Sequence, residues 1–230
     1  MLQRPYWGAS MTDTLSKEEV DQQNLAMLAA LLKLLRPGTI VGVDEVGRGA
    51  LAGPIVAAAA AVSIDWKPPK LLTDSKRLSP ARREQLFESL KDDDHVVVGI
   101  GEVSAAEIDK GDIDAAQADA QAEAIRATFY RLAYPPFVVV DGMRLPAIGK
   151  PDVAEVVCLP RADRLVPAVS LASVFAKVVR DRLMVELSDT YKGYGFAAHK
   201  GYGVKAHMDA IERLGPCEIH RRSFRPFKVD

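Results

Sequence analysis

Residues 39–64 read TIVGVDEVGRGALAGPIVAAAAAVSI, and this stretch decides the fold. Apolar residues dominate both of its ends, which predicts a strand over Thr39–Asp44 and a second strand, its partner, over Gly53–Ile64. The glycines between the two strands favour a tight turn. The longest apolar run, residues 50–62, is shorter than the roughly 18–20 residues that cross a bilayer. It therefore indicates a buried strand, and no membrane segment is expected.

Two adjacent acids, Asp44 and Glu45, stand where the first strand ends. Each buried charge needs a compensating partner, and a divalent cation would supply one. Successive strand residues point to opposite faces, so these acids share one cluster only if the backbone turns here. Gly47 and Gly49 make such a turn easy. A β-turn with exposed acids is the alternative.

Two further acids stand near the ends of predicted elements. Asp141 ends the apolar strand predicted over Phe137–Asp141 and precedes Gly142. Open α/β sheets commonly place ligands at the carboxyl ends of strands, which favours a functional role, although an aspartate that only caps a turn is the alternative. Asp163 lies shortly before a helix predicted over Val169–Thr190.

That helix carries Ser173, Lys177 and Arg180 at spacings of four and three residues, so these polar groups share one face. A basic and polar face beside a carboxylate suits a site for metal and phosphate. Arg48, between two glycines, can offer phosphate a fork of hydrogen-bond donors. An ordinary surface helix and an ordinary glycine-rich turn are the alternatives.

Four carboxylates without a histidine or cysteine cluster make an all-oxygen donor set, which suits Mg²⁺ or Mn²⁺ and disfavours zinc. Two such cations about 3.5–4 Å apart can activate a water and stabilise the leaving oxygen in phosphodiester cleavage. The donor set is Asp44, Glu45, Asp141 and Asp163. The sequence therefore predicts a metal-dependent nuclease.

Periodicity and chain breakers predict an α/β fold, a mixed sheet flanked by helices with a helical C-terminal extension. Further helices are expected over Ser16–Leu35, Ser79–Leu90, Ile113–Ala133 and Tyr202–Leu214, and further strands over His95–Val103 and Glu155–Leu159. We divide the chain into an N-terminal extension with an amphipathic helix (1–38), a catalytic domain (39–190) and a C-terminal helical substrate-binding portion of the same domain (191–230).

Charge is unevenly distributed, although the 230 residues sum to a net charge of −1. Residues 91–123 hold ten acidic residues against two lysines, whereas residues 161–182 and 199–230 each carry a net charge of +3. One basic side can bind a phosphate backbone, although ordinary solvated faces would give the same pattern. With two cysteines and no secretory signal, we expect a cytoplasmic protein with free thiols.

With these residues in place, the chain closely resembles the type 2 ribonucleases H, specifically bacterial ribonuclease HII. The resemblance runs from about residue 39 to 228 and leaves only the first 38 residues uncovered. The matching blocks are Gly42–Gly49 with Leu51–Pro54, Thr73–Lys76, Phe137–Gly142, Asp163–Arg182, His199–Gly203 and Gly215–Pro226. One departure is Ala162, where many bacterial relatives carry glycine, and it leaves the following carboxylate in place.

The resemblance implies a ribonuclease H-like fold and a role for each matching position. The implied catalytic, metal-binding carboxylates are Asp44, Glu45, Asp141 and Asp163. The backbone of Gly47, Arg48 and Gly49 would recognise the 2′-hydroxyl group at the RNA–DNA junction, the group that separates RNA from DNA. Tyr202 would stack on the neighbouring deoxyribose, with a core aromatic as the alternative, and Lys76 would contact a backbone phosphate.

The implied reaction is hydrolysis on the 5′ side of a ribonucleotide, which leaves 3′-hydroxyl and 5′-phosphate ends. The implied substrates are RNA–DNA hybrids and duplex DNA that contains single ribonucleotides, cleaved by a monomer with Mn²⁺ or Mg²⁺. A ribonuclease HIII-like nuclease is one alternative, disfavoured by Arg48 and by an N-terminus too short for an extra domain. A non-catalytic hybrid-binding protein is the other, disfavoured because all four carboxylates are present.

Overall fold

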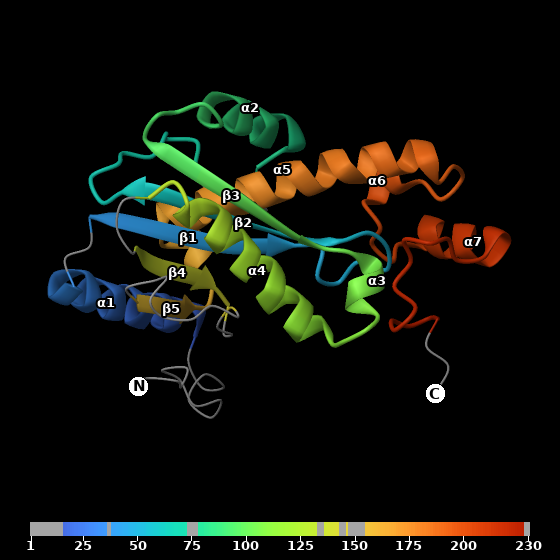
Figure 1. The fold of residues 1–230 in the computed structure, drawn as a ribbon, viewed down its shortest axis with the longest axis horizontal. Helices are drawn as coiled ribbons and strands as arrows, with labels where there is room; N and C mark the ends of the chain where they lie inside the picture. Colours follow the sequence, from blue (N-terminus) through green and yellow to red (C-terminus); the bar gives the residue numbers. More distant parts are fainter. Residues whose placement is uncertain are drawn as a thin grey trace.

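The computed structural model describes residues 16–35, 38–72, 78–132, 136–142, 146 and 155–227. Its centre is a five-stranded sheet in the order β3-β2-β1-β4-β5 (Figure 1). The strands are β1 (Thr39–Val46), β2 (Ile55–Ser63), β3 (Val96–Val103), β4 (Phe137–Asp141) and β5 (Glu155–Leu159). β2 pairs antiparallel with β1 and β3, whereas β4 pairs parallel with β1 and β5. The mixed sheet that the sequence predicts is confirmed.

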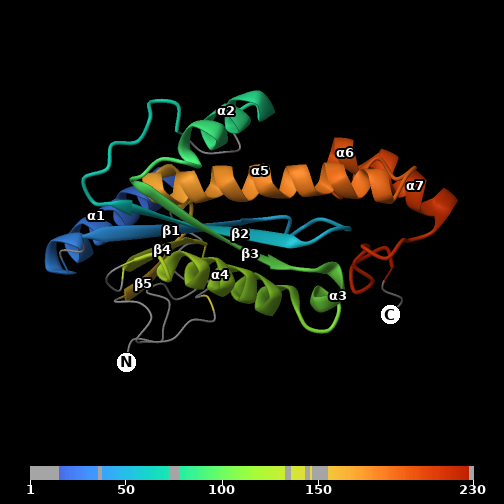
Figure 2. The same cartoon turned by 45° about the horizontal axis from the view of Figure 1, so that its top comes forward.

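Helices cover both faces of this sheet. In the described ranges they are α1 (Lys17–Leu35), α2 (Pro80–Leu90), α3 (Ala105–Ile108), α4 (Ile113–Phe129), η2 (Ala162–Arg164), α5 (Pro167–Thr190), α6 (Phe196–His199) and α7 (Lys205–Leu214). Figure 2 shows α5 along one face and α4 along the other. Strand residues alternate between the faces. Ala58 and Ala60 therefore pack in the cluster on the α5 side, whereas Ala57 and Ala59 pack on the α4 side.

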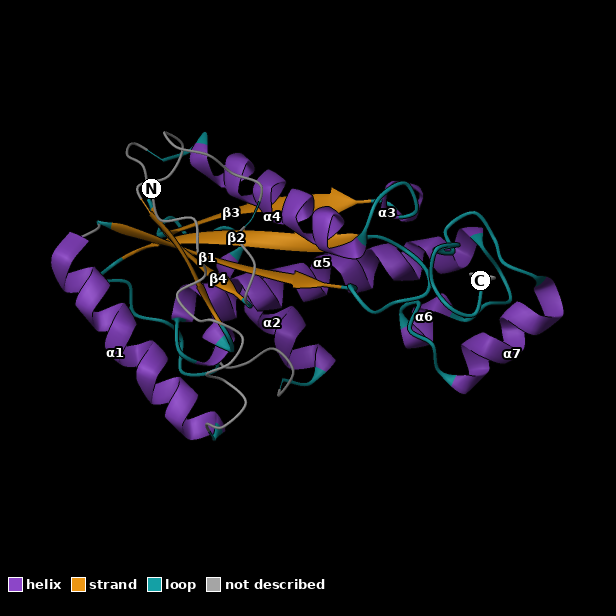
Figure 3. Cartoon of the chain, turned by 90° about the horizontal axis from the view of Figure 1, so that it is seen from below, coloured by secondary structure: helices purple, strands orange, loops and turns teal. Residues whose placement is uncertain are grey.

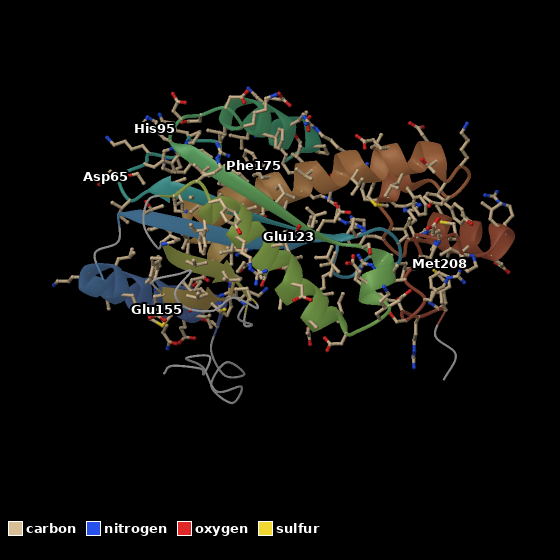
Figure 4. The ribbon with its side chains drawn as sticks, viewed as in Figure 1. Asp65, His95, Glu123, Glu155, Phe175 and Met208 are labelled. Carbon is tan, nitrogen blue, oxygen red and sulfur yellow. The ribbon has the colours of Figure 1, made fainter. Side chains whose placement is uncertain are left out.

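Small residues in the central strands let the helices approach the sheet closely. Residues 57–61 of β2 are all alanine and all buried. A Cβ atom at Gly42 of β1 would lie 2.1 Å from the backbone carbonyl carbon of Ala168, at the start of α5. Phe175 of α5 extends the same core to α2, where its ring centroid lies 4.7 Å from that of Phe87 (Figure 4).

The C-terminal helices lie at one end of the molecule, far from α1 (Figure 3). α6 and α7 close a third apolar cluster around Phe196. The segment after α7 then returns to the loop between β1 and β2. The Gly53 N–H donates to the Ile219 carbonyl oxygen at 2.9 Å, and the Arg221 N–H donates to the Leu51 carbonyl oxygen at 2.9 Å. Residues far apart in sequence therefore build this loop together.

The predicted boundaries hold to within a few residues for most elements. Ser79 caps α2 as predicted, because its side chain accepts a hydrogen bond from the Arg82 N–H at 3.3 Å. β1 continues to Val46 rather than ending at Asp44, since its pairing with β2 continues. α4 ends at Phe129, and the end predicted for it at residue 133 lies outside the described residues.

Short elements depart most from the predictions. α3, η2 and α6 have three or four residues each, too few for a periodic pattern to indicate them. α7 begins at Lys205 rather than Tyr202, because Lys200 and Gly201 take left-handed conformations that end α6 and turn the chain. None of the helices in the described ranges has the length and apolar character needed to cross a membrane.

Candidate active site

The two adjacent acids lie inside β1, which stays extended through both positions because both pair with β2. Their side chains therefore point to opposite faces of the sheet. The Asp44 carboxylate accepts a hydrogen bond from the side chain of Ser173 on α5. Glu45 Oε2 accepts one from Gln121 Nε2 on α4 at 2.8 Å. The turn that the sequence allows at these acids is not formed, and the first left-handed residue is Gly47, with φ 91°.

Asp141 ends β4 beside these acids. Val43 of β1 pairs with Val140 of β4, so Asp44 and Asp141 are the next residues on neighbouring strands. Burial raises the pKa of Asp44 well above its usual range, and the charges of Asp141 and Glu45 raise it further. Burial also raises the pKa of Glu45, with a contribution from the charge of Asp141. Three carboxylates therefore repel one another at this edge of the sheet.

Asp163 is placed next to Asp141 through the backbone. It lies in η2 and is 3% exposed. The N–H of Ala162, the preceding residue, donates to Asp141 Oδ1 at 2.9 Å. The hydroxyl group of Ser170 donates to the backbone carbonyl oxygen of Asp163, which ties η2 to the first turn of α5. Neighbouring elements thus bring all four predicted carboxylates to one region of the fold.

The region is not a closed metal cage. Within the residues that the structure describes, no group of three or more histidine, cysteine or carboxylate side chains is gathered closely enough to hold a metal ion. Close convergence of all four carboxylates stays a prediction. Their chemistry nevertheless fits a hard cation, because all the donor atoms are oxygens. Burial and the repulsion between the carboxylates also raise the pKa values of Asp44 and Glu45. A divalent cation would relieve both effects.

The glycine turn after β1 has one crowded side and one open side. Gly47 has φ 91°, and a Cβ atom there would lie 2.1 Å from Arg180 Nε, so no larger residue fits. A Cβ atom at Gly49 would meet no atom within 4 Å. The guanidinium group of Arg48 is bound over α4, where it donates to Asp114 Oδ1 at 2.6 Å and to Gln117. Its predicted fork of donors to phosphate is therefore engaged within the protein in this structure.

Two fully buried arginines bind backbone carbonyl groups of the loop between β1 and β2. Arg180 donates to the carbonyl oxygens of Pro54, Lys200 and Ala52 at 2.9, 3.0 and 3.2 Å. Arg221 donates twice to the Gly53 carbonyl oxygen, at 3.0 and 2.8 Å, and once to that of Arg48, at 2.8 Å. The sequence places Arg180 among the substrate contacts. Because it is fully buried and bonded to backbone carbonyls, this structure gives it a positioning role instead.

The other predicted contacts on α5 are only partly available to a substrate. Ser173 is buried and engaged with Asp44. Lys177 forms an ion pair with Asp181 at 2.7 Å and lines a cavity of about 570 Å³ between α2, α5 and α6. Lys200 lines the same cavity. Lys76, the predicted phosphate contact, lies outside the described residues.

Three site residues escape local sequence reasoning. Gln117 and Gln121 are buried on α4 and bind Arg48 and Glu45, respectively. Their spacing of four residues in an alanine-rich helix places them on one face, which could have indicated them. Arg221 gives no such signal, because its partners are 168 and 173 residues away in the chain.

Tyr202 follows α6 and is half-buried, with Arg180 Cζ 5.4 Å from the centre of its ring. A histidine pair holds its backbone. His207 Nδ1 donates to the Tyr202 carbonyl oxygen at 3.0 Å, and His207 Nε2 lies 3.1 Å from His220 Nε2. His220 Nδ1 accepts the Cys217 N–H at 2.9 Å, so its Nε2 carries the proton and donates to His207. Both rings are therefore neutral.

Acidification should destabilise the protein through this histidine pair. Burial, followed by the neighbouring His207, lowers the pKa of His220 to about 4. In the unfolded chain the same ring binds a proton near pH 6.5. The stability that depends on neutral His220 is therefore fully present above about pH 6.5. It is lost as the pH falls from there towards the pKa of His220 in the folded protein. We expect urea unfolding at pH 5 to show a loss of about 2 kcal/mol from His220 relative to neutral pH.

Variants separate this loss from that of other titrating groups. The raised pKa values of Asp44 and Glu45 act in the opposite direction, because protonation relieves their repulsion as the pH falls. His220→Gln should flatten the acid limb of the stability profile. His95→Gln, at an exposed position labelled in Figure 4, should leave the profile as it is. Equal acid limbs for wild type and His220→Gln would contradict the assignment.

Comparison with known proteins identifies the family. The family model described as Ribonuclease HII matches residues 41–226. The chain belongs to the ribonuclease HII family. The Ribonuclease HII of Moorella thermoacetica is 43% identical over 206 residues, which cover 87% of this chain and 94% of that protein. The ribonuclease H2 structure from Pyrococcus horikoshii is 27% identical with a TM-score of 0.62, and the match covers 82% of this chain and 95% of that one.

A structure of Bst ribonuclease HIII in complex with Mn²⁺ is also similar, with a TM-score of 0.63 over 82% of this chain and 68% of that one. At 20% identity this likeness concerns the fold. As a member of the ribonuclease HII family, the chain is an enzyme, a nuclease of the ribonuclease H class. The ribonuclease H-like fold implied by its sequence blocks is confirmed. A non-catalytic hybrid-binding protein is correspondingly disfavoured.

Proposed function

We propose that this member of the ribonuclease HII family hydrolyses the RNA strand of RNA–DNA hybrids and also incises duplex DNA on the 5′ side of a single embedded ribonucleotide, leaving 3′-hydroxyl and 5′-phosphate ends. Family membership supports the hydrolysis of RNA in hybrids. The observation that carries the finer proposal is the juxtaposition of two features. The repelling carboxylates of Asp44 and Glu45, near the end of β1, and of Asp141, at the end of β4, lie beside a glycine turn whose Gly49 faces open space.

Asp44, Glu45, Asp141 and Asp163 would hold two Mg²⁺ or Mn²⁺ ions. When bound, such ions activate a water and stabilise the leaving oxygen of a phosphodiester. The protein supplies the orientation of their ligands. The hydroxyl of Ser173 and the amide of Gln121 fix the first two carboxylates, and a backbone N–H fixes that of Asp141. Hydrogen-bonded supporting residues of this kind tune metal sites.

The glycine turn would select the ribonucleotide. A 2′-hydroxyl group both donates and accepts hydrogen bonds, so the backbone of Gly47, Arg48 and Gly49 can recognise it where no side chain intervenes. The buried Arg180 and Arg221 donate hydrogen bonds to carbonyl groups of the loop between β1 and β2, which contains this turn, and keep the loop preorganised. Preorganisation lowers the ordering cost of binding.

A cleavage assay on a DNA duplex that contains one ribonucleotide tests the proposal. We expect incision 5′ of that ribonucleotide with Mg²⁺ or Mn²⁺ and none with EDTA. An all-RNA strand paired with DNA measures hybrid preference in the same experiment. Efficient cutting of the hybrid without incision at a single ribonucleotide would favour ribonuclease HIII-like specificity, and binding of both substrates without cutting would refute the nuclease proposal.

Tyr202→Ala should lower kcat/KM for single-ribonucleotide incision by about 10–100-fold, because we take the contact of its ring with the deoxyribose to be comparable with base–aromatic stacking, roughly 1–3 kcal/mol. Tyr202→Phe should retain most of the activity, since it keeps the ring. Tyr130→Ala, at a tyrosine that directly follows α4 and is 89% exposed, is the matched control. An unchanged rate for Tyr202→Ala would restore the interpretation of this residue as a core aromatic.

A further inference from the structure

Helix α1 precedes the part of the chain that the family model matches, and it contacts the turn between β5 and η2. Asn24 Nδ2 donates to the Pro160 carbonyl oxygen at 3.0 Å. Asp21 Oδ1 accepts hydrogen bonds from Nε and Nη2 of Arg161 at 3.1 and 2.8 Å. The same Nη2 donates to the Lys17 carbonyl oxygen at 2.5 Å. Three residues of α1 therefore hold two consecutive residues of one turn.

This turn has a backbone conformation that benefits from outside support. Arg161 has φ 61° and ψ 32°, in the left-handed region that residues other than glycine rarely adopt. η2 begins directly after it and has no side-chain cap. The Ala162 N–H binds Asp141 Oδ1, and Asp163 is the next residue. A shift of the turn would therefore displace two of the four proposed metal ligands together.

The polar contacts of α1 go beyond what packing requires. Leu28 is buried in the core, and Met27, Leu31 and Leu32 pack against it, so α1 already has an apolar anchor. Asn24 is only 1% exposed, and burying an amide costs free energy unless it is hydrogen-bonded. The side chains of the ion pair between α1 and Arg161 are 24% and 27% exposed. A buried ion pair is weak evidence of added stability, and in some proteins such pairs specify one arrangement of the chain instead.

We propose that α1 is a positioning element of the metal site. Asp21 and Asn24 fix the turn at residues 160–161. This turn then fixes the positions in which Asp141 and Asp163 would bind divalent cations. This inference rests on the proposed function in that those cations serve the nuclease. It assigns a role to the N-terminal segment, for which the sequence predicts only a helix.

Mn²⁺ titration of the full-length protein without nucleic acid tests the inference, with binding measured by calorimetry and by the paramagnetic resonance signal of free Mn²⁺. Asp21→Ala and Asn24→Ala should each weaken Mn²⁺ binding about tenfold or more, the size of effect that supporting residues have on metal sites. They should also raise the Mg²⁺ concentration needed for half-maximal cleavage, with KM for the duplex unchanged. Asp21→Glu, which keeps a partner for Arg161, should restore most of the affinity.

Two controls separate positioning from folding. Glu18→Ala changes an exposed acid on the same helix and should leave Mn²⁺ binding unaltered. Leu28→Ala should lower the unfolding midpoint without lowering Mn²⁺ affinity. Wild-type affinity in both test variants, or a loss no larger than that of Leu28→Ala, would overturn the inference. Because binding is measured without cleavage, failure of the proposed nuclease activity would not be mistaken for failure of this role.

Discussion

Asp141→Asn should reduce incision at a single ribonucleotide by at least about 1000-fold, on the order of 4 kcal/mol in the activation free energy. Asp141 is the carboxylate whose charge acts on both Asp44 and Glu45. Asparagine keeps the shape and an acceptor oxygen for the Ala162 N–H, so the local fold should survive. The lost charge is what a divalent cation needs. Single-turnover cleavage with saturating enzyme measures the effect on chemistry alone.

The same substitution should raise the unfolding midpoint of the protein in EDTA at neutral pH. Removing one of three repelling charges lowers the cost of keeping the other two ionised in the folded state. Asp119→Asn changes an exposed acid on α4 and serves as the control for net charge. Hybrid affinity should be retained and should weaken with salt through counterion release. Cleavage within tenfold of wild type, or a lower unfolding midpoint in EDTA, would contradict the role of Asp141.

Arg221→Gln should lower the free energy of unfolding by about 3–5 kcal/mol, since buried acceptors left without donors cost roughly 1–3 kcal/mol each. Arg221 is fully buried and donates three hydrogen bonds to the carbonyl oxygens of Arg48 and Gly53. Burial, followed by the nearby charge of Arg180, lowers its pKa to about 9. A glutamine cannot reach both acceptors. The loop should then lose its shape before the sheet unfolds.

Urea unfolding measures the stability loss, and cleavage below the unfolding transition measures the effect on the loop. We expect incision at single ribonucleotides to fall further than cutting of long hybrids, because this loop carries the glycine turn that we propose recognises the 2′-hydroxyl group. Arg222→Gln alters the exposed neighbour, whose guanidinium group donates to the Pro216 carbonyl oxygen, and should change either quantity little. A stability loss for Arg221→Gln as small as that of Arg222→Gln would refute the argument from buried acceptors.

Short sequence patterns predict the strands and helix caps whose formation depends on neighbouring residues in the chain. The strands around Asp44 and Asp141 follow from short apolar runs, and the helix caps follow from single residues such as Ser79. The alternation rule correctly places Asp44 and Glu45 on opposite faces. The turn that would let both acids join one metal cluster is not formed, and their shared cluster stays a prediction. The structure instead brings the two acids into interaction through a neighbouring strand that carries Asp141.

Helical spacing also predicts which residues share a face, but not what that face meets. Ser173, Lys177 and Arg180 lie along one side of α5 as expected. Along that side, Ser173 contacts the Asp44 carboxylate of β1, Lys177 lines the cavity beside α2, and Arg180 binds the loop between β1 and β2. Only the tertiary arrangement distinguishes a buried positioning residue such as Arg180 from a side chain such as Lys177 that lines a cavity. The partners of Arg221 and Asn24 are invisible for the same reason, since they lie 136 to 173 residues away.

The loop that follows β1 takes its closing hydrogen bonds from Gly201, Ile219 and Arg221. A ribosome releases the chain from its N-terminus, so the acids of β1 emerge long before these residues do. A nascent chain can therefore form much of the sheet while this loop still lacks the groups that support it. The loop therefore reaches its supported conformation only after Ile219 and Arg221 have been made.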